Sequence, residues 1–136
     1  MNQMREGEIL LVDDREEDVA LALRALRRHD LAGRMVVARD GVEALELLLP
    51  DSLAEAVHFL PRVIPLDLKL PRLSGVEVLR RLKQDERTRA VPVVALASSD
   101  QEAEIAICCE FGVNSYIVKP VEFEAFARAV GDPGTY

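Results

Sequence analysis

The residues best suited to chemistry in this sequence are three aspartates and a lysine at or near the ends of short apolar runs. They are Asp13, Asp14, Asp67 and Lys119. Each run is typical of a strand buried in a parallel sheet. Because ligands of open α/β sheets bind beyond the carboxyl ends of the strands, we expect the four side chains to meet at that edge. Three carboxylates and one ammonium group there would suit a divalent cation and a phosphoryl group.

The adjacent acids Asp13 and Asp14 admit two interpretations. Beside Asp67 they would repel one another unless a cation were present, and Mg²⁺ prefers such oxygen ligands while keeping several of its waters. The pair could equally begin a loop and cap a helix expected at 16–29. Taken in isolation, the pair favours neither interpretation over the other.

Asp67 is harder to explain by a purely structural role, because it lies inside the apolar run 63–68, where an unpaired charge is costly. A carboxylate beside a metal ion can act as a nucleophile and form an acyl phosphate. Mg²⁺ would neutralise the charge that builds on the transferring oxygens. Lys119 could pair with Asp67 or with a phosphoryl oxygen, although alone it would be taken for a surface lysine.

Apolar runs alternate with amphipathic segments along the chain, which predicts an α/β fold of five strand–helix units. The expected strands are 8–13, 35–38, 63–68, 91–97 and 115–118, and the expected helices are 16–29, 41–49, 75–83, 101–111 and 122–130. Because crossovers between parallel strands are right-handed, the sheet should carry helices on both faces. A less regular insertion is expected at 51–60. The stripe of Ala103, Ile105 and Ala106 is predicted to face the core.

Size and composition limit the class of protein. The chain has 136 residues, so we expect a single domain over 1–136, with its core at about 7–130 and a loose tail at 131–136. A net charge of −7 argues against nucleic acid as the main partner. No apolar run approaches the ~20 residues of a membrane span, and no signal-like segment begins the chain, so a cytoplasmic location is expected. Cys108 and Cys109 are adjacent, which suits neither an ordinary disulfide nor a zinc site.

Taken together, the sequence resembles the receiver domain of two-component response regulators from Glu8 to about Val130. The segments that carry the resemblance are 9–14, 40–45, 67–75, 92–94 and 116–120. The resemblance implies a doubly wound, flavodoxin-like (βα)5 parallel sheet with strand order 2-1-3-4-5. It also implies a phosphoprotein of phosphorelay signal transduction. Such a protein accepts a phosphoryl group from a sensor histidine kinase in a Mg²⁺-dependent reaction and is not itself an enzyme.

The same resemblance assigns a role to each residue of the motif. Asp67 would be the phosphoacceptor, and Lys119 would contact the phosphoryl group. Asp13, Asp14 and Asp67 would hold the metal ion. The backbone carbonyl of Lys69 would complete the protein ligands of that ion.

A narrower resemblance is to the single-domain regulators associated with bacterial phytochrome kinases. It rests on the longer stretch 50–61, on the run 93–99 and on the lack of a following output domain. It implies a stand-alone regulator whose kinase is a bacterial phytochrome. The signal would then pass to a partner protein, through a homodimer, or onward as phosphate.

The sequence departs from the family pattern at position 97, where the switch residue is Thr or Ser and this chain has Ala97. Ser98 is adjacent, but neighbouring strand residues point to opposite faces, so its hydroxyl could serve only if the strand end turned or bulged there. The aromatic residue expected to follow the switch is Tyr116. A lost hydrogen bond to a charged group is worth roughly 1.5–3 kcal/mol, comparable with a typical allosteric coupling energy. The alternative function is therefore a receiver-like binding module that works without phosphorylation.

Two further functions are disfavoured, and one residue has no functional explanation. A phosphatase with an aspartyl nucleophile usually has a second acid two positions later, where this chain has Lys69. A flavodoxin would need a phosphate-binding loop after the first strand, and the loop 13–16 is acidic and lacks glycine. Pro65 removes a ladder hydrogen bond from the expected central strand, so a local irregularity is predicted just before Asp67.

Overall fold

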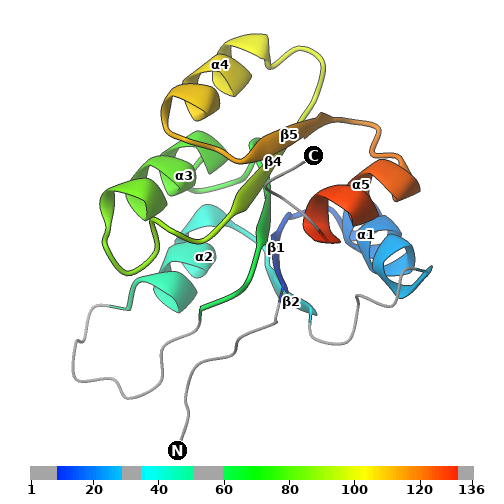
Figure 1. The fold of residues 1–136 in the computed structure, drawn as a ribbon, viewed down its shortest axis with the longest axis horizontal. Coiled ribbons are helices and arrows are strands. Elements are labelled where there is room, and N and C mark those ends of the chain that lie inside the picture. Colours follow the sequence, from blue (N-terminus) through cyan, green and yellow to red (C-terminus); the bar gives the residue numbers. More distant parts are fainter. Residues whose placement is uncertain (1–8, 29–34, 51–59, 132–136) are drawn as a thin grey trace, which may run out of the picture.

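The computed structural model describes residues 9–28, 35–50 and 60–131. Its strands are β1 (Ile9–Val12), β2 (Met35–Ala38), β3 (Ile64–Asp67), β4 (Val93–Ala97) and β5 (Ser115–Val118). Its helices are α1 (Glu16–Arg28), α2 (Gly41–Leu48), α3 (Gly75–Gln84), α4 (Glu102–Glu110) and α5 (Phe123–Gly131). The strands form one parallel sheet in the order β2-β1-β3-β4-β5 (Figure 1), which confirms the predicted topology. The insertion predicted at 51–60 and the loose tail lie almost entirely outside the described residues.

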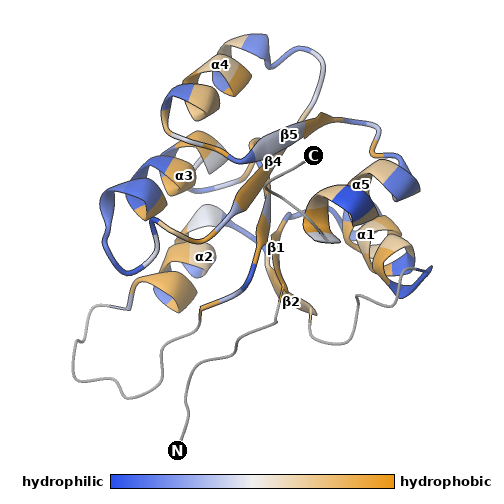
Figure 2. Ribbon diagram, in the orientation of Figure 1, coloured by the Kyte–Doolittle hydropathy of each residue, from blue (hydrophilic) through white to orange (hydrophobic). Residues whose placement is uncertain are grey.

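Helices cover both faces of the sheet, with α1 and α5 on one face and α2, α3 and α4 on the other (Figure 1). Successive strand residues alternate between two cores, so that Leu10 and Val12 face α2–α4 while Ile9 and Leu11 face α1 and α5. Every residue of β1, β3 and β4 is buried. Two covered faces explain why these strands are continuous apolar runs, as the hydropathy colouring in Figure 2 shows.

The ends of the elements differ from the predicted ones by at most two residues, and the largest difference is at β4. This strand was predicted from residue 91 and begins at Val93. The N–H of Val91 donates to the carbonyl of Thr88 at 3.0 Å, so Val91 closes a turn. Val93 is the first residue of β4 that pairs with β3, opposite Ile64.

Pro65 interrupts the pairing of the central strand β3 on one side. β3 pairs with β4 over four consecutive positions. Its pairing with β1 is limited to Val12 with Leu66 and an isolated bridge between Ile9 and Val63. Because proline has no N–H to donate, the ladder is broken beside it. The predicted irregularity is therefore present, and it lies toward β1.

Helix α4 differs from the burial that its apolar residues predict. Ala103 and Ala106 are exposed and Ile105 is half-buried, so the predicted core stripe is wrong for two of its three residues. Cys108 is the one buried residue of this helix. Burial raises the pKa of its thiol to about 11, whereas Cys109 is exposed. The apolar residues of α4 therefore divide between core and surface.

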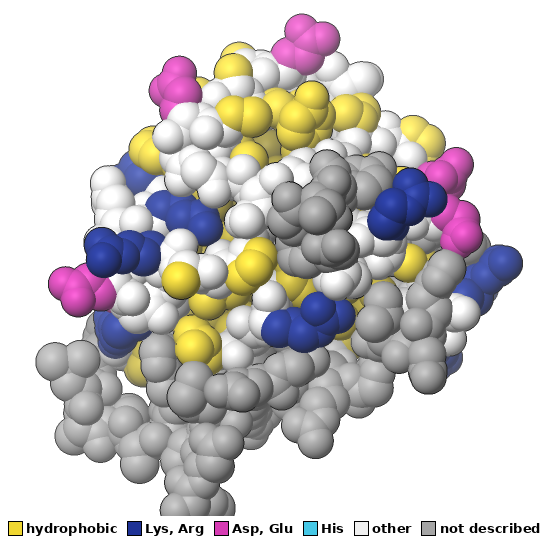
Figure 3. Space-filling model, viewed as in Figure 1, with side chains coloured by type: hydrophobic (Ala, Val, Ile, Leu, Met, Phe, Trp, Pro, Cys, Tyr) yellow, Lys and Arg dark blue, Asp and Glu magenta, His cyan; other side chains and the backbone are white. Residues whose placement is uncertain are grey.

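Apolar side chains reach the surface over α4 and β5. Ile107, Tyr116 and Val118 are exposed by 41%, 45% and 43%. Figure 3 shows apolar side chains gathered in the upper part of the view, where these two elements lie. Among the residues that the structure describes, no helix has the length and apolar character that crossing a membrane requires.

Candidate functional site

Three of the predicted site residues meet at the carboxyl edge of the sheet. Asp13 follows β1 directly, and its N–H donates to the carbonyl of Ala38 at 3.0 Å. Asp67 is the last residue of the neighbouring strand β3 and is 2% exposed. Lys119 follows β5, where its N–H donates to the carbonyl of Ala97 at 2.7 Å. The strand order thus brings residues that are far apart in the sequence to one place.

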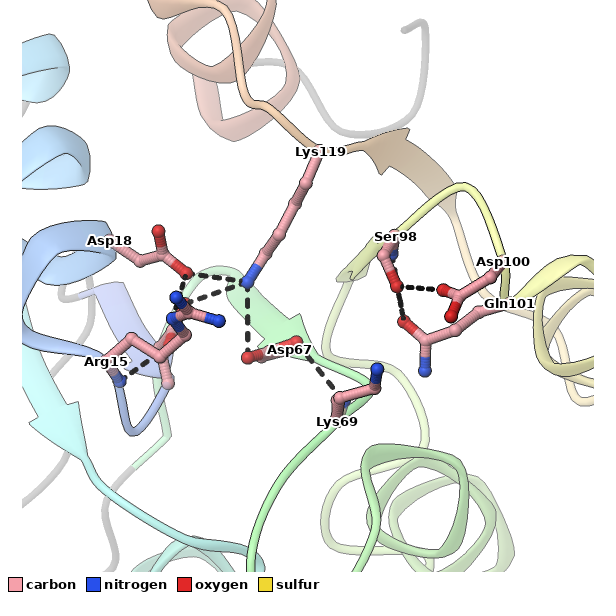
Figure 4. A network of polar contacts seen from close by, with 9 residues as sticks. Arg15, Asp18, Asp67, Lys69, Ser98, Asp100, Gln101 and Lys119 are labelled. Carbon is pink, nitrogen blue, oxygen red and sulfur yellow. Dashed lines mark hydrogen bonds and ion pairs between the residues drawn. The ribbon is translucent and has the colours of Figure 1, made fainter.

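The ammonium group of Lys119 lies among three carboxylates (Figure 4). Its Nζ is 2.7 Å from Asp18 Oδ2, 3.3 Å from Asp67 Oδ2 and 3.7 Å from Asp13 Oδ2. The structure therefore places Lys119 beside Asp67, as the sequence suggested. The nearest carboxylate, which belongs to Asp18 of α1, was not predicted.

Asp18 has an ordinary explanation in the sequence, which is why it was not singled out. With Glu16 and Glu17 it forms the acidic first turn of α1, and acids in that position are favoured by the helix macrodipole. The signal that could have identified it is position. A helix that starts at the carboxyl edge of the sheet keeps its first turn within reach of any group at that edge.

The loop backbone holds the two buried carboxylates from the other side. Asp13 Oδ1 accepts a hydrogen bond from the Arg15 N–H at 3.0 Å, and Asp67 Oδ1 accepts one from the Lys69 N–H at 3.2 Å. In both aspartates Oδ2 is the oxygen that faces Lys119. Each side chain therefore has one oxygen fixed by its own loop and one turned toward a shared cation.

A hollow of about 370 Å³ lies beside this cluster. The residues that line it are Asp14, Arg15, Asp67, Lys69, Ser98, Gln101 and Lys119. Asp14 is exposed on this wall and stands outside the close group of carboxylates around Lys119. The predicted metal ligands are thus divided. Asp13 and Asp67 lie in the cluster, and Asp14 and Lys69 contribute to the adjoining wall.

The Asp13 carboxylate is harder to ionise than an ordinary aspartate, because it is buried beside a second carboxylate. Burial and the nearby Asp67 carboxylate raise the pKa of Asp13 to about 6, against the opposing effects of the Arg15 N–H and Lys119. Burial alone would lower the pKa of Lys119, but its hydrogen bond to Asp18 and the neighbouring carboxylates raise it. The cluster therefore has excess negative charge and only hard oxygen donors, a combination that fits a divalent cation such as Mg²⁺.

We expect Asp13→Asn to stabilise the metal-free protein near pH 7.5. In the folded state the pKa of Asp13 is about 6, above its ordinary value of 3.8, so the folded state holds the proton more tightly than the unfolded state. Stability contributed by this group is present at low pH, falls as the pH rises from 3.8 to 6, and is lost above that. Asparagine removes the penalty, so the free energy of unfolding should rise by roughly 1–3 kcal/mol. Urea denaturation in the presence of EDTA measures it.

The matched control is Asp14→Asn, which neutralises the adjacent but exposed carboxylate and should change stability little. Near pH 4 most of the advantage of Asp13→Asn over the wild type should disappear, because Asp13 is then protonated in the folded wild type and about half protonated in the unfolded chain. Equal stability of Asp13→Asn and the wild type at both pH values would show that burial does not penalise this carboxylate.

The switch position contains no hydroxyl, but one lies next to it. Ala97 is fully buried and ends β4, paired with Val118. Ser98 lies beyond the strand end in a turn, where its carbonyl accepts from the Gln101 N–H at 3.0 Å. The chain therefore turns at Ser98, as its hydroxyl would require in order to act in place of the missing one. Ser98 also lines the same hollow as Asp67. Tyr116 is largely exposed.

The fold and the cluster define a class of protein. A parallel sheet of order 2-1-3-4-5 with an aspartate–lysine cluster at its carboxyl edge is the arrangement expected of a receiver domain. Residues 9–131 match the family described as "Response regulator receiver domain". The chain therefore belongs to the response regulator receiver domain family.

Proteins similar to this chain include phytochrome response regulators. The chain is 40% identical to the "Probable methanogenesis regulatory protein FilR2" of Methanothrix harundinacea (strain 6Ac) over 129 residues, which cover 94% of this chain and 81% of that protein. Among solved structures, the bacteriophytochrome response regulator RtBRR is 42% identical with a TM-score of 0.79, over 95% of this chain and 78% of that one. The Mn(2+)-bound form of response regulator Rcp1 is 30% identical with a TM-score of 0.80, over 94% of both chains. The phosphorylated cyanobacterial phytochrome response regulator RcpA is 34% identical with a TM-score of 0.76, over 93% and 89%.

Proposed function

We propose that this protein is a stand-alone response regulator that accepts a phosphoryl group on Asp67 from a sensor histidine kinase, in a reaction that requires Mg²⁺. One observation carries the proposal. The buried Asp67 carboxylate lies at the carboxyl edge of the sheet, 3.3 Å from the Lys119 ammonium, on the wall of a hollow. Membership of the receiver family and similarity to phytochrome response regulators support it.

In the proposed reaction an oxygen of Asp67 attacks the phosphorus atom of a phosphohistidine. An O–P bond forms as the N–P bond breaks, and the imidazole nitrogen leaves with the electron pair and takes a proton. The Lys69 N–H keeps the carboxylate oriented. Lys119 would stabilise negative charge on the phosphoryl oxygens, because its ammonium already lies beside the reacting carboxylate. The protein ends as an acyl phosphate, so we propose a phosphoacceptor and not a turnover enzyme.

The acidic residues of the site fit Mg²⁺. The supporting observation is the raised pKa of Asp13, which is caused first by burial and then by the neighbouring Asp67 carboxylate. Asp13, Asp14, Asp67 and the backbone carbonyl of Lys69 would hold the ion. When bound there, Mg²⁺ would neutralise charge on the phosphoryl oxygens. The similarity to a Mn(2+)-bound structure of Rcp1 also supports a cation at this edge.

The alternative of a binding module that works without phosphorylation gains no support from the comparisons. It rests on Ala97, which does leave the switch position without a hydroxyl. However, Ser98 and the amide of Gln101 bring polar groups to the same hollow. One of the similar structures is also that of a phosphorylated protein.

Partner and location extend the proposal. Similarity to RtBRR makes a bacterial phytochrome kinase the first phosphoryl donor to test. The net charge of −7 does not favour nucleic acid as a partner. Homodimer formation and a cytoplasmic location stay predictions from the sequence.

The direct test is labelling by a small phosphodonor such as acetyl phosphate. With Mg²⁺ present, we expect the intact mass to increase by one phosphoryl group. Chelation of the metal with EDTA should lower the labelling rate by more than about tenfold, because a bound cation is worth several kcal/mol to such a reaction. Absence of a label in Mg²⁺ would overturn the proposal, and an equal rate in EDTA would remove the metal from it.

A further inference from the structure

The side chain of Gln101 is a buried polar group at the phosphoacceptor hollow that the proposed reaction does not use. The residue precedes α4 at its N-cap position and is 8% exposed. Its side chain makes no capping hydrogen bond to its own helix. It turns back instead toward the end of β4, where Oε1 accepts from the Ser98 N–H at 2.9 Å. Gln101 thus connects the end of β4 with the start of α4.

The orientation of the Gln101 carboxamide follows from this contact. A backbone N–H requires an acceptor, so the oxygen and not the nitrogen must face Ser98. Figure 4 shows the carboxamide between Ser98 and Lys69, with its nitrogen pointing away from Ser98. In the described part of the chain, Nε2 has no acceptor within hydrogen-bonding distance. This nitrogen is not among the fully buried atoms that lack a partner, so it is open to water or to a ligand oxygen in the hollow that Gln101 lines.

The other donors near Asp67 already have partners. The Lys69 N–H is bonded to Asp67 itself, and the Ser98 N–H to Gln101. The Ser98 hydroxyl donates to Asp100 Oδ1 at 2.6 Å. The Gln101 amide nitrogen is therefore an uncharged side-chain donor on this wall that is available for a new acceptor. A phosphoryl group on Asp67 would bring three acceptor oxygens into the same hollow.

We propose that the Gln101 Nε2 group donates a hydrogen bond to a phosphoryl oxygen on Asp67, and so links phosphorylation to the start of α4. The amide then serves where Ala97 offers no hydroxyl. This inference rests on the proposed function, because it needs the phosphoryl group on Asp67. It makes Gln101 a residue that senses the phosphoryl group, in addition to holding the Ser98 turn.

The test uses beryllofluoride, a mimic of the phosphoryl group, with Mg²⁺ and the whole chain. We expect Gln101→Met, which keeps the side-chain length and removes the amide, to weaken beryllofluoride binding roughly tenfold, the loss expected for one hydrogen bond to a charged group. In ¹H–¹⁵N NMR spectra of the wild type, the Gln101 side-chain NH₂ signals and the backbone amides of the first turn of α4 should shift on binding. In Gln101→Met the shifts in α4 should shrink.

Two further variants separate sensing from a structural role. Gln101→Glu retains an acceptor for the Ser98 N–H but loses both amide hydrogens, so it should also bind beryllofluoride more weakly while staying folded. Gln84→Met makes the same replacement at an exposed glutamine, the last residue of α3, and should bind like the wild type. Binding by Gln101→Met within twofold of the wild type, or NH₂ signals that do not move, would overturn the inference. A wild type that does not bind beryllofluoride, or binds it equally with Asp67→Asn, would instead overturn the proposed function.

Discussion

Asp67→Asn is expected to remove phosphoryl labelling by acetyl phosphate almost completely. The carboxylate oxygen that forms the O–P bond is replaced by an amide, which is not a nucleophile under these conditions. Loss of a nucleophile costs a reaction on the order of 10³-fold or more. The variant should remain folded, because it neutralises one member of a crowded carboxylate cluster without changing its shape. Intact-mass measurement over time, with a thermal melt to show folding, checks this expectation.

The control for this variant is Asp85→Asn, the same change at the residue that follows α3. Asp85 pairs with Arg87 and does not line the hollow, so this variant should be labelled at the wild-type rate. Fragment masses should locate the label on Asp67 in both the wild type and the control. A label that persists in Asp67→Asn at the wild-type rate would mean that another residue is the acceptor.

Gly75→Ala should both destabilise the protein and slow the labelling of Asp67. Gly75 begins α3, and its N–H donates to the carbonyl of Leu68 at 3.0 Å. A Cβ atom at Gly75 would lie 2.4 Å from the Asp67 carbonyl oxygen and 2.6 Å from Leu68 Cα. Because these are backbone atoms at the end of β3, the strand end or the helix must move. Overpacking of this kind costs roughly 1–3 kcal/mol, and a displaced Asp67 would lose its alignment with Lys119.

Gly112→Ala separates the loss of stability from the displacement of Asp67. Gly112 has φ +88°, a conformation that disfavours alanine, and its added Cβ would have no neighbour within 4 Å. This variant should lose roughly 1 kcal/mol of stability and keep the wild-type labelling rate. Urea denaturation and labelling kinetics compare the two variants. Wild-type labelling by Gly75→Ala would show that the close approach of α3 does not position the phosphoacceptor.

The fold was predictable because its signals are local. Strands covered on both faces are continuous apolar runs, and the residues that follow them stand at one edge whatever the details of packing. That logic was sufficient to predict that Asp13, Asp67 and Lys119 would lie together. Pro65 predicted the interrupted pairing with β1, because the missing N–H is a property of proline itself.

The remaining features depend on how helices pack, which short patterns do not determine. Asp18 is one of three acids in the first turn of α1, so the sequence does not distinguish it from its neighbours. Its contact with Lys119 depends on where α1 lies against the sheet. Gln101 lies in a turn, and nothing in the sequence shows that its long side chain bends back to Ser98. The predicted core stripe of α4 is wrong because small residues such as Ala103 are equally suited to core and surface.

The position of Lys119 among three carboxylates also determines which ions can balance the site. Four carboxylates, those of Asp13, Asp18, Asp67 and the adjacent Asp14, face only two cations here, Lys119 and the Arg15 guanidinium, whose Nε lies 4.0 Å from Asp18 Oδ2. The remainder in this cluster is a double negative charge, equal and opposite to that of one alkaline-earth ion. A sodium or potassium ion would leave half of it unbalanced. Selection between monovalent and divalent ions at this edge therefore follows from charge counting before any difference in ionic radius is considered.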